Sequence, residues 1–218
     1  MKPDRAWVLL PSRQRLNLLE PDAWAWTDED LAIGLSRTYR WAGYSAWDLP
    51  LSVAQHSLTV LALRMTASRH PLTPDQQRRE LLHDATEALL GGWDPITPLK
   101  PHLGEGFHRL ATRLQAAIDL RYALPPWDED EYRRHKQADR LAAASEAFHV
   151  AGWSRQAMRD DLEIDLAPLD EDPLAPVPEF RPWEPWPPKH AAARFLAELH
   201  RLQPTDSPRS DKAGEAAA

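Results

Sequence analysis

The feature that most constrains this chain is the dipeptide His83-Asp84, which lies inside the apolar stretch from Leu81 to Leu90. A helix over that stretch buries an imidazole and a carboxylate side by side, and both groups are costly to remove from water. A shared cation is the simplest compensation. Adjacent helix positions point about 100° apart, so both side chains reach one ion only in the groove beside neighbouring helices. The remaining ligands must then come from other helices.

The rest of the sequence predicts an all-α fold with a small N-terminal β-hairpin. Two short apolar runs around a polar turn at 11–14 predict the hairpin. Thr27 with Asp30 and Ser52 with Gln55 indicate capping boxes that open two helices. A third helix has Thr73 as N-cap, Pro74 at its first position and Gln76 at its third. We expect helices at about 27–37, 53–69, 74–90, 107–120 and 128–149, and a last amphipathic helix around 192–199.

The 218 residues suit a single domain with appendages. We expect a hairpin extension at 1–26, the main domain at 27–165, a Pro- and Trp-rich segment with a C-terminal helix packed on the domain at 166–202, and a disordered tail at 203–218. The Pro-rich stretch 168–188 favours an extended path, which Trp183 and Trp186 could anchor.

Composition narrows the classes of partner. The 33 acidic and 26 basic residues leave a net charge of -7, which argues against stable nucleic-acid binding. The absence of cysteine excludes disulfides, thiolate nucleophiles and zinc ribbons. The sequence has neither a signal-like apolar stretch nor a run of about 18 apolar residues, so we expect a cytoplasmic protein without a membrane partner. A homodimer or higher homo-oligomer stays open.

Two further side chains are candidate ligands. His56 shares a helical face with Val53 and Val60, which turns it inward, and Asp139 lies among alanines that permit close helix approach. With His83 and Asp84 they would leave two positions open on an octahedral ion such as Mn²⁺, Co²⁺ or Fe²⁺, which is typical of a hydrolytic site. Glu87, one turn after His83, could exchange a proton there.

Four strings in this order resemble the HD-domain phosphohydrolases, most closely the small branch of bacterial 5'-deoxynucleotidases and phage enzymes that hydrolyse dATP. The strings are Ser52-Val53-Ala54-Gln55-His56-Ser57, His83-Asp84-Ala85-Thr86-Glu87-Ala88, Pro95-Ile96-Thr97-Pro98-Leu99-Lys100 and Ala138-Asp139. The resemblance covers about 27–149. A lone His-Asp pair would be a weak signal, whereas the ordered pattern is fairly specific.

The resemblance implies an HD-domain helical bundle with its catalytic domain at 27–165. It implies one divalent ion (Co²⁺, Mn²⁺, Zn²⁺, Fe²⁺ or Mg²⁺) held by His56, His83, Asp84 and Asp139, with Asp84 and Glu87 as catalytic residues. It also implies that Arg40 and Trp41 contact the phosphate and sugar of a nucleotide, and that Lys100 and Asp94 contribute to substrate binding. The loop 91–94 is about two residues longer than the Gly-Asp turn of that branch.

Three functions are compatible with these residues. The first is a nucleotide phosphohydrolase that releases phosphate from deoxynucleoside 5'-monophosphates. The second is a dNTP triphosphohydrolase of the dATP type, and the third is a nucleotide- or partner-binding module with little turnover. The structural alternatives are a solvated Glu87 or Lys100, a core or lid position for Trp41, and a role for His135 behind the ligands or at the surface rather than as a fifth ligand.

Overall fold

The computed structural model describes residues 5–95, 97–174 and 176–203. Its described part is mostly helical, with one small hairpin. Along the chain the elements are β1 (Trp7–Leu9), β2 (Arg15–Asn17), α1 (Asp28–Arg37), a 3-10 turn η1 (Trp41–Gly43), α2 (Val53–Ala67), α3 (Pro74–Leu81), α4 (Ala85–Leu89), a second 3-10 turn η2 (Thr97–His102), α5 (Gly104–Arg121), α6 (Glu129–His149), α7 (Arg155–Leu162) and α8 (Pro188–Arg201).

The predicted hairpin is confirmed, and it is joined to the first helix. Strands β1 and β2 pair antiparallel with Val8 opposite Leu16, and Leu16 is fully buried. The carboxylate of Asp30 completes the predicted capping box with Thr27 and also accepts a 2.8 Å hydrogen bond from the Ser12 backbone N–H in the hairpin turn. One side chain therefore starts α1 and fixes the hairpin against it.

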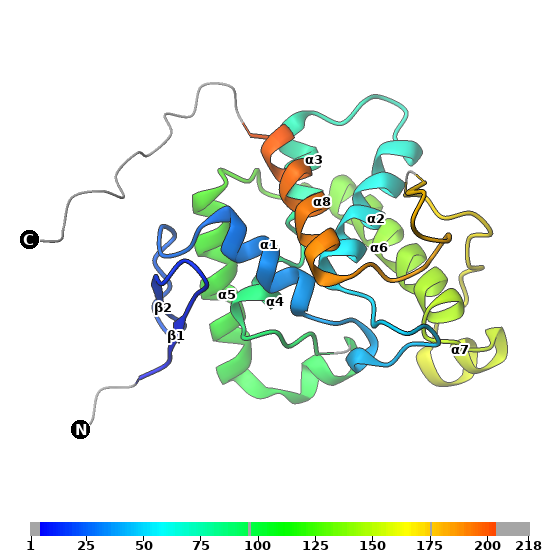
Figure 1. The fold of residues 1–218 in the computed structure, drawn as a ribbon, viewed down its shortest axis with the longest axis horizontal. Coiled ribbons are helices and arrows are strands. Elements are labelled where there is room, and N and C mark those ends of the chain that lie inside the picture. Colours follow the sequence, from blue (N-terminus) through cyan, green and yellow to red (C-terminus); the bar gives the residue numbers. More distant parts are fainter. Residues whose placement is uncertain (1–4, 96, 175, 204–218) are drawn as a thin grey trace, which may run out of the picture.

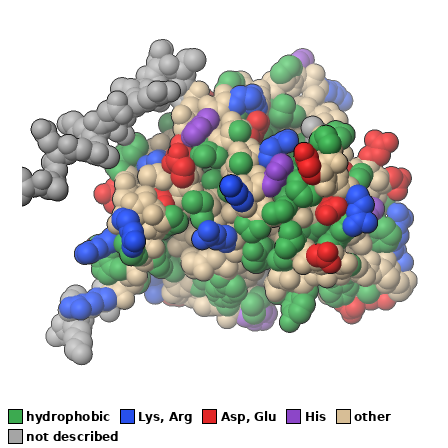
Figure 2. All heavy atoms as spheres, viewed as in Figure 1, with side chains coloured by type: hydrophobic (Ala, Val, Ile, Leu, Met, Phe, Trp, Pro, Cys, Tyr) green, Lys and Arg blue, Asp and Glu red, His purple; other side chains and the backbone are tan. Residues whose placement is uncertain are grey.

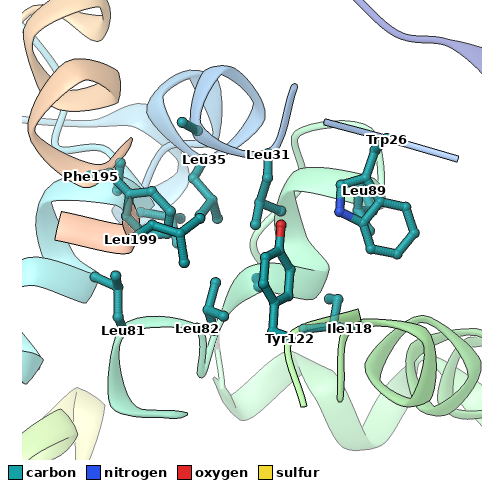
Figure 3. Close-up of a cluster of buried hydrophobic side chains, with 14 of the residues drawn as sticks. Trp26, Leu31, Leu35, Leu81, Leu82, Leu89, Ile118, Tyr122, Phe195 and Leu199 are labelled. Carbon is teal, nitrogen blue, oxygen red and sulfur yellow. The ribbon is translucent and has the colours of Figure 1, made fainter. Parts of the chain in front are cut away.

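The main apolar core lies between α1, α8 and the segment from α3 to α5. Figure 3 shows Leu31 of α1 facing Leu82 and Tyr122, while Phe195 of α8 approaches from the side. All these side chains except the Tyr122 hydroxyl are apolar, and the buried members of their cluster are at most 9% exposed. Burial of this size is the main favourable term in folding.

Helices α1 and α8 are neighbours although they are far apart in sequence, and α2 packs on α6 (Figure 1). Gly34 permits a close approach of α1 to α4, because a Cβ at this position would lie 2.8 Å from the Cβ of Ala88. The face of the molecule shown in Figure 2 carries interspersed acidic, basic and apolar side chains. Among the described residues, no helix combines the length and hydrophobicity needed to cross a membrane.

Several predicted helix boundaries agree with the structure, and two predictions were wrong. Ser52 caps α2 by accepting from the Gln55 backbone N–H, but the Gln55 side chain does not close the capping box. It binds instead to the C-terminal segment, donating to the Glu184 carbonyl at 3.0 Å and accepting from the Trp186 N–H at 2.8 Å. The contacts with the C-terminal segment thus take up the Gln55 side chain, which a capping box would have used.

The second wrong prediction is the continuous helix over 74–90. The structure breaks it into α3 and α4, with Leu82 at φ -99° and ψ 13° and Asp84 at φ -106° and ψ 17°. Helix α7 was not predicted, although Ser154 caps it and Met158 and Leu162 share one face. The 166–187 path contains no helix or strand among its described residues, and Trp183 and Trp186 are buried as expected. The predicted tail lies outside the described residues from 204 onward.

Candidate metal centre

The break between α3 and α4 has a local cause in the His83 side chain. In a continuous helix the Glu80 carbonyl would accept the N–H of Asp84. In this protein it accepts the Nδ1–H of His83 at 2.8 Å instead, and the next backbone bonds tighten to i→i−3 contacts such as Ala85 N–H to Leu82 O. The competing side-chain bond ends α3. Because the chain turns at this place, His83 and Asp84 point to the same side, where regular helix positions would diverge.

His56, on α2, is held in the same manner by a different acceptor. Its ring is fully buried, and its Nδ1 lies 2.6 Å from Oε1 of Glu146 on α6. Since a carboxylate only accepts, Nδ1 carries a proton, and Nε2 is the ring nitrogen left to bind a metal. His83 has the same tautomer because its Nδ1 faces a carbonyl. Both histidines therefore direct Nε2 toward the centre, where it can bind either a second proton or a metal ion.

Those two nitrogens meet the Asp84 carboxylate. The Oδ2 atom of Asp84 lies 3.2 Å from Nε2 of His83 and 3.6 Å from Nε2 of His56. One ligand atom from each of these three residues lies within 4.8 Å of the others, a spacing that could hold a metal ion. The three predicted ligands His56, His83 and Asp84 are thus brought together.

The residues present fit a metal ion by two independent observations. Nε2 of His56 and Nε2 of His83 are both buried, and neither has a hydrogen-bond partner among the described residues. Two imidazole nitrogens that face a carboxylate at this distance require a proton or a metal cation between them. Each imidazole also donates its other N–H to a protein oxygen, which is the usual outer support of a metal-ligating histidine. The donor set, imidazole nitrogen with carboxylate oxygen, suits a divalent transition metal.

Asp139, the fourth predicted ligand, lies at the edge of this group. Its Oδ1 is 3.4 Å from Nε2 of His56, and its Oδ2 accepts a hydrogen bond from Nζ of Lys136 at 2.5 Å. Asp139 belongs to α6, so the four predicted residues come from α2, from the α3–α4 break and from α6. One oxygen of the Asp139 carboxylate thus binds the Lys136 ammonium, which partly neutralises its charge, and the other oxygen faces His56.

The electrostatics of the group favour positive charge at its centre. Burial opposes a charge on His56 and Arg40 repels it, but the carboxylates of Glu146 and Asp139 outweigh both and raise the pKa of His56 to about 9. Burial likewise opposes ionisation of Asp84, and yet His83 and His56 hold its pKa far below the usual value. A site that retains protons on imidazole at neutral pH is one where a metal cation can replace them.

Glu87 lies beside this centre and is buried, at 4% exposure. Burial, with the nearby charges of Asp84 and Asp94, raises the pKa of Glu87 well above its usual value. Its Oε1 is 3.5 Å from Nζ of Lys100, whereas Oε2 is buried without a partner among the described residues. The structure therefore brings Lys100 to Glu87 and leaves one carboxyl oxygen of Glu87 free to handle a proton.

Arg40 connects the loop after α1 to the centre. Its Nη1 donates to Asp94 Oδ2 at 3.2 Å and its Nε to Glu146 Oε2 at 3.4 Å, so the same Glu146 carboxylate supports both Arg40 and His56. Burial opposes the Arg40 charge, but these carboxylates raise its pKa and keep it protonated. Asp94, a predicted substrate contact, is an ion-pair partner of Arg40 in the structure.

Trp41 and His135 lie around the centre rather than in it. Trp41 packs against the cluster formed by Ala144, Ala147 and Met158, which supports the structural alternative for this residue. His135 is buried, and its Nδ1 contacts Oε2 of Glu80 at 2.7 Å, while its ring lies 4.8 Å from that of His83. This is a position behind the ligands.

Sequence reasoning missed two supporting residues, Glu80 and Glu146. Glu80 binds His83 through its carbonyl and Arg64 and His135 through its carboxylate. Glu146 gives a usable signal: it lies seven residues after Asp139, on the same helical face, in the alanine-rich half of α6. Glu80 gives none, because its main role depends on a helix break that the pattern does not predict.

The fold and the centre define a helical protein with a candidate divalent-metal site between α2, α6 and the α3–α4 break. No family model matches the chain. An uncharacterized protein of Rhodobacter capsulatus is 41% identical over 152 residues, which cover 69% of this chain and 76% of that protein. The chain therefore belongs to the same family as that Rhodobacter protein.

Proposed function

We propose that this protein is a metal-dependent phosphohydrolase of the HD-domain type that acts on nucleotides, with deoxynucleoside 5'-monophosphates as substrates. The observation that carries the proposal is the pair of buried, partner-free Nε2 atoms that face Asp84, with Asp139 beside them. On an octahedral ion, two imidazoles and two carboxylates fill four positions and leave two for water and substrate. A divalent ion in such a site supplies charge neutralisation and a more acidic water.

The residues around the centre suit the proton and charge changes of phosphate-ester hydrolysis. In that reaction the oxygen of water bonds to phosphorus, the bond from phosphorus to O5' breaks, and O5' takes up a proton. Glu87 has a raised pKa and a free carboxyl oxygen, so it can hold the proton that the leaving oxygen needs. Arg40, which pairs with Asp94, and Lys100, which pairs with Glu87, would bind the phosphate oxygens.

The proposal is tested with purified protein loaded with Mn²⁺ or Co²⁺ and assayed against dNMPs, NMPs and dNTPs. We expect release of inorganic phosphate from dNMPs, and we expect Asp139→Ala to abolish both metal retention and turnover. Arg15→Gln is a suitable control, because Arg15 is exposed in strand β2 of the hairpin. Full activity in Asp139→Ala, or none of the wild-type protein on any phosphate ester, would refute the assignment.

A second candidate is the dNTP triphosphohydrolase, because a groove with basic side chains adjoins Asp139. Product analysis separates the two functions: triphosphate formed from a dNTP identifies the second. A nucleotide-binding module with little turnover is the remaining alternative, and metal-loaded protein that binds dNMP without releasing phosphate would establish it.

A further inference from the structure

The C-terminal strap, which we define as residues 166–187 between α7 and α8, lies outside 27–149, the part of the chain that resembles the HD-domain family. Its described residues form neither helix nor strand, although Trp183 and Trp186 are buried. Figure 1 shows the strap, in yellow to orange, passing α6 and α2. Because such a segment has no regular hydrogen-bond pattern of its own, its backbone groups bind partners elsewhere, and those partners indicate its role.

The strap makes its first contact with α2 through Gln55. This side chain is buried, and it forms two hydrogen bonds with the backbone of the strap. Its Nε2 donates to the Glu184 carbonyl at 3.0 Å, and its Oε1 accepts from the Trp186 N–H at 2.8 Å. Gln55 directly precedes His56 in α2. The strap is therefore joined to the helical turn that carries a proposed metal ligand.

The strap makes its second contact with α6 through the backbone of Leu169. The Leu169 N–H donates to Ser145 Oγ at 3.0 Å, and the Leu169 carbonyl accepts from His149 Nε2 at 2.7 Å. The His149 ring also stacks on Trp183 of the strap, with ring centroids 4.9 Å apart and planes 6° apart. Ser145 directly precedes Glu146 in α6. This contact therefore holds the turn that carries the carboxylate behind His56.

The two contacts lie next to the hydrogen bond that joins α2 to α6. In that bond, Nδ1 of His56 lies 2.6 Å from Oε1 of Glu146. The strap itself is closed between its two contacts by the Asp172 carboxylate, which accepts the N–H of Leu174 at 2.9 Å and that of Trp183 at 2.8 Å. A closed strap that is bound to both helices limits how far they can move apart.

We propose that the C-terminal strap positions His56 for metal binding by holding α2 against α6. The inference rests on the proposed function, since the metal centre belongs to that function. Gln55 and Ser145 are positioning residues, because they act through the backbone that they share with His56 and Glu146. A ligand has to be held within about 0.5 Å of its productive position, and the partners that orient a ligating histidine typically contribute about 10- to 100-fold in metal affinity.

The first test measures Mn²⁺ binding to metal-free, full-length protein by isothermal titration. Gln55→Leu removes both hydrogen bonds of the α2 contact with little change in side-chain size, and it should weaken Mn²⁺ binding about tenfold. Gln77→Leu is the matched control. Gln77 on α3 also forms two hydrogen bonds, with Leu72 and Arg201, and neither partner belongs to the metal centre. The Mn²⁺ affinity of this control should match that of the wild type.

The second test measures the position of His56 in the absence of metal. The proton that His56 Nδ1 donates to Glu146 should give a downfield proton NMR resonance, which is assigned by its loss in His56→Asn. Gln55→Leu should shift or broaden this resonance. The corresponding proton of His135, which is bound to Glu80 at 2.7 Å, serves as an internal reference and should stay unchanged.

Ser145→Ala tests the α6 contact with the same two measurements. It removes a single oxygen, so it decides the question if Gln55→Leu does not fold. A loss of Mn²⁺ affinity or a moved His56 resonance in these two variants, without the same change in Gln77→Leu, supports the proposal. Wild-type values in both variants, or an equal loss of affinity in Gln77→Leu, overturn it.

Failure of the proposed function is distinguishable from failure of this inference. If the wild-type protein binds Mn²⁺ but hydrolyses no phosphate ester, the hydrolase is refuted and the effect of the strap on Mn²⁺ affinity still decides the inference. If the wild-type protein binds no Mn²⁺, the metal centre is refuted, and with it the role of the strap in metal binding. A His56 resonance that moves in Gln55→Leu would then show only that the strap fixes α2 against α6.

Discussion

Two buried regions of this protein are filled in opposite ways. The apolar core around Leu31, Leu82 and Phe195 excludes polar groups almost entirely, and it joins α1, α8 and α3 to α5. The polar interior, which we define as His56, His83, Asp84, Asp139 and Glu146, lies between α2, α6 and the α3–α4 break. Leu82 and His83 are consecutive residues, so the two regions meet at one peptide bond.

We therefore expect the apolar core to determine the stability of the fold and the polar interior to determine metal binding. Apolar burial stabilises the fold whatever occupies the centre. A cluster of buried carboxylates and imidazoles lowers stability unless its charges are balanced, and such clusters are frequent at functional sites. Changes in the two regions should therefore have separable effects.

The largest expected effect follows from His83→Ala. It removes one partner-free Nε2 and also the side-chain bond that ends α3, so the protein should lose metal retention and at least about 10³-fold in turnover, which corresponds to roughly 4 kcal/mol. Metal content by elemental analysis and initial rates measure this change. Thermal unfolding of the metal-free form measures separately the loss of the bond that ends α3. Wild-type metal content in the variant would contradict the assignment.

The reverse separation is expected for Phe195→Ala in the apolar core. Phe195 is fully buried on α8, so its truncation should lower the free energy of unfolding by about 3–5 kcal/mol through lost burial and a cavity. Denaturant unfolding measures it. At temperatures where the variant is folded, its metal dissociation constant should stay within about threefold of the wild type, roughly 0.7 kcal/mol. A large loss of metal affinity would show that the two regions are coupled.

Metal addition should stabilise the protein through the polar interior alone. An ion at 100 times its dissociation constant contributes about 2.7 kcal/mol, which for a protein of this size is a rise of roughly 5–10 °C in Tm. Scanning calorimetry with Mn²⁺ and with a chelator tests this. Asp84→Asn, which weakens the carboxylate shared by both imidazoles, should remove most of the rise.

The smallest expected effect is the loss of metal affinity when Glu146 is changed. It tests whether a residue that only supports a ligand of the polar interior contributes to metal binding. Glu146→Gln keeps a hydrogen-bond acceptor for His56 but removes the charge that also holds Arg40, so metal affinity should fall about 10- to 100-fold. Glu146→Ala should weaken it further. Isothermal titration of Mn²⁺ measures both variants, with Arg15→Gln as the control. Unchanged affinity in both would show that Glu146 is a passive neighbour.

Local signals in the sequence were sufficient for most elements. The capping residues Thr27 and Thr73 bond as their spacing predicts, because a cap involves only side chains and backbone within one turn. The apolar face of α8 and the hairpin follow from periodicity, whereas α2 is buried on all sides over its first nine residues. Helix α7 was missed because two apolar residues, Met158 and Leu162, are too few in a helix of 8 residues to stand out in the sequence.

Residue types and their order determined the candidate centre: three of the four predicted ligands form one compact group, and Asp139 adjoins it through His56. Only the tertiary structure decided how they meet. The break after Leu81 arises because the His83 imidazole competes for the Glu80 carbonyl. The spacing of apolar residues in the sequence gives no sign of this side-chain hydrogen bond. Glu146 supports His56 although the two residues are 90 positions apart in the sequence. The groove along α6 is lined by residues of that helix and of the segment after α7. Sequence order can name such groups, but their distances and hydrogen bonds exist only once the helices have packed.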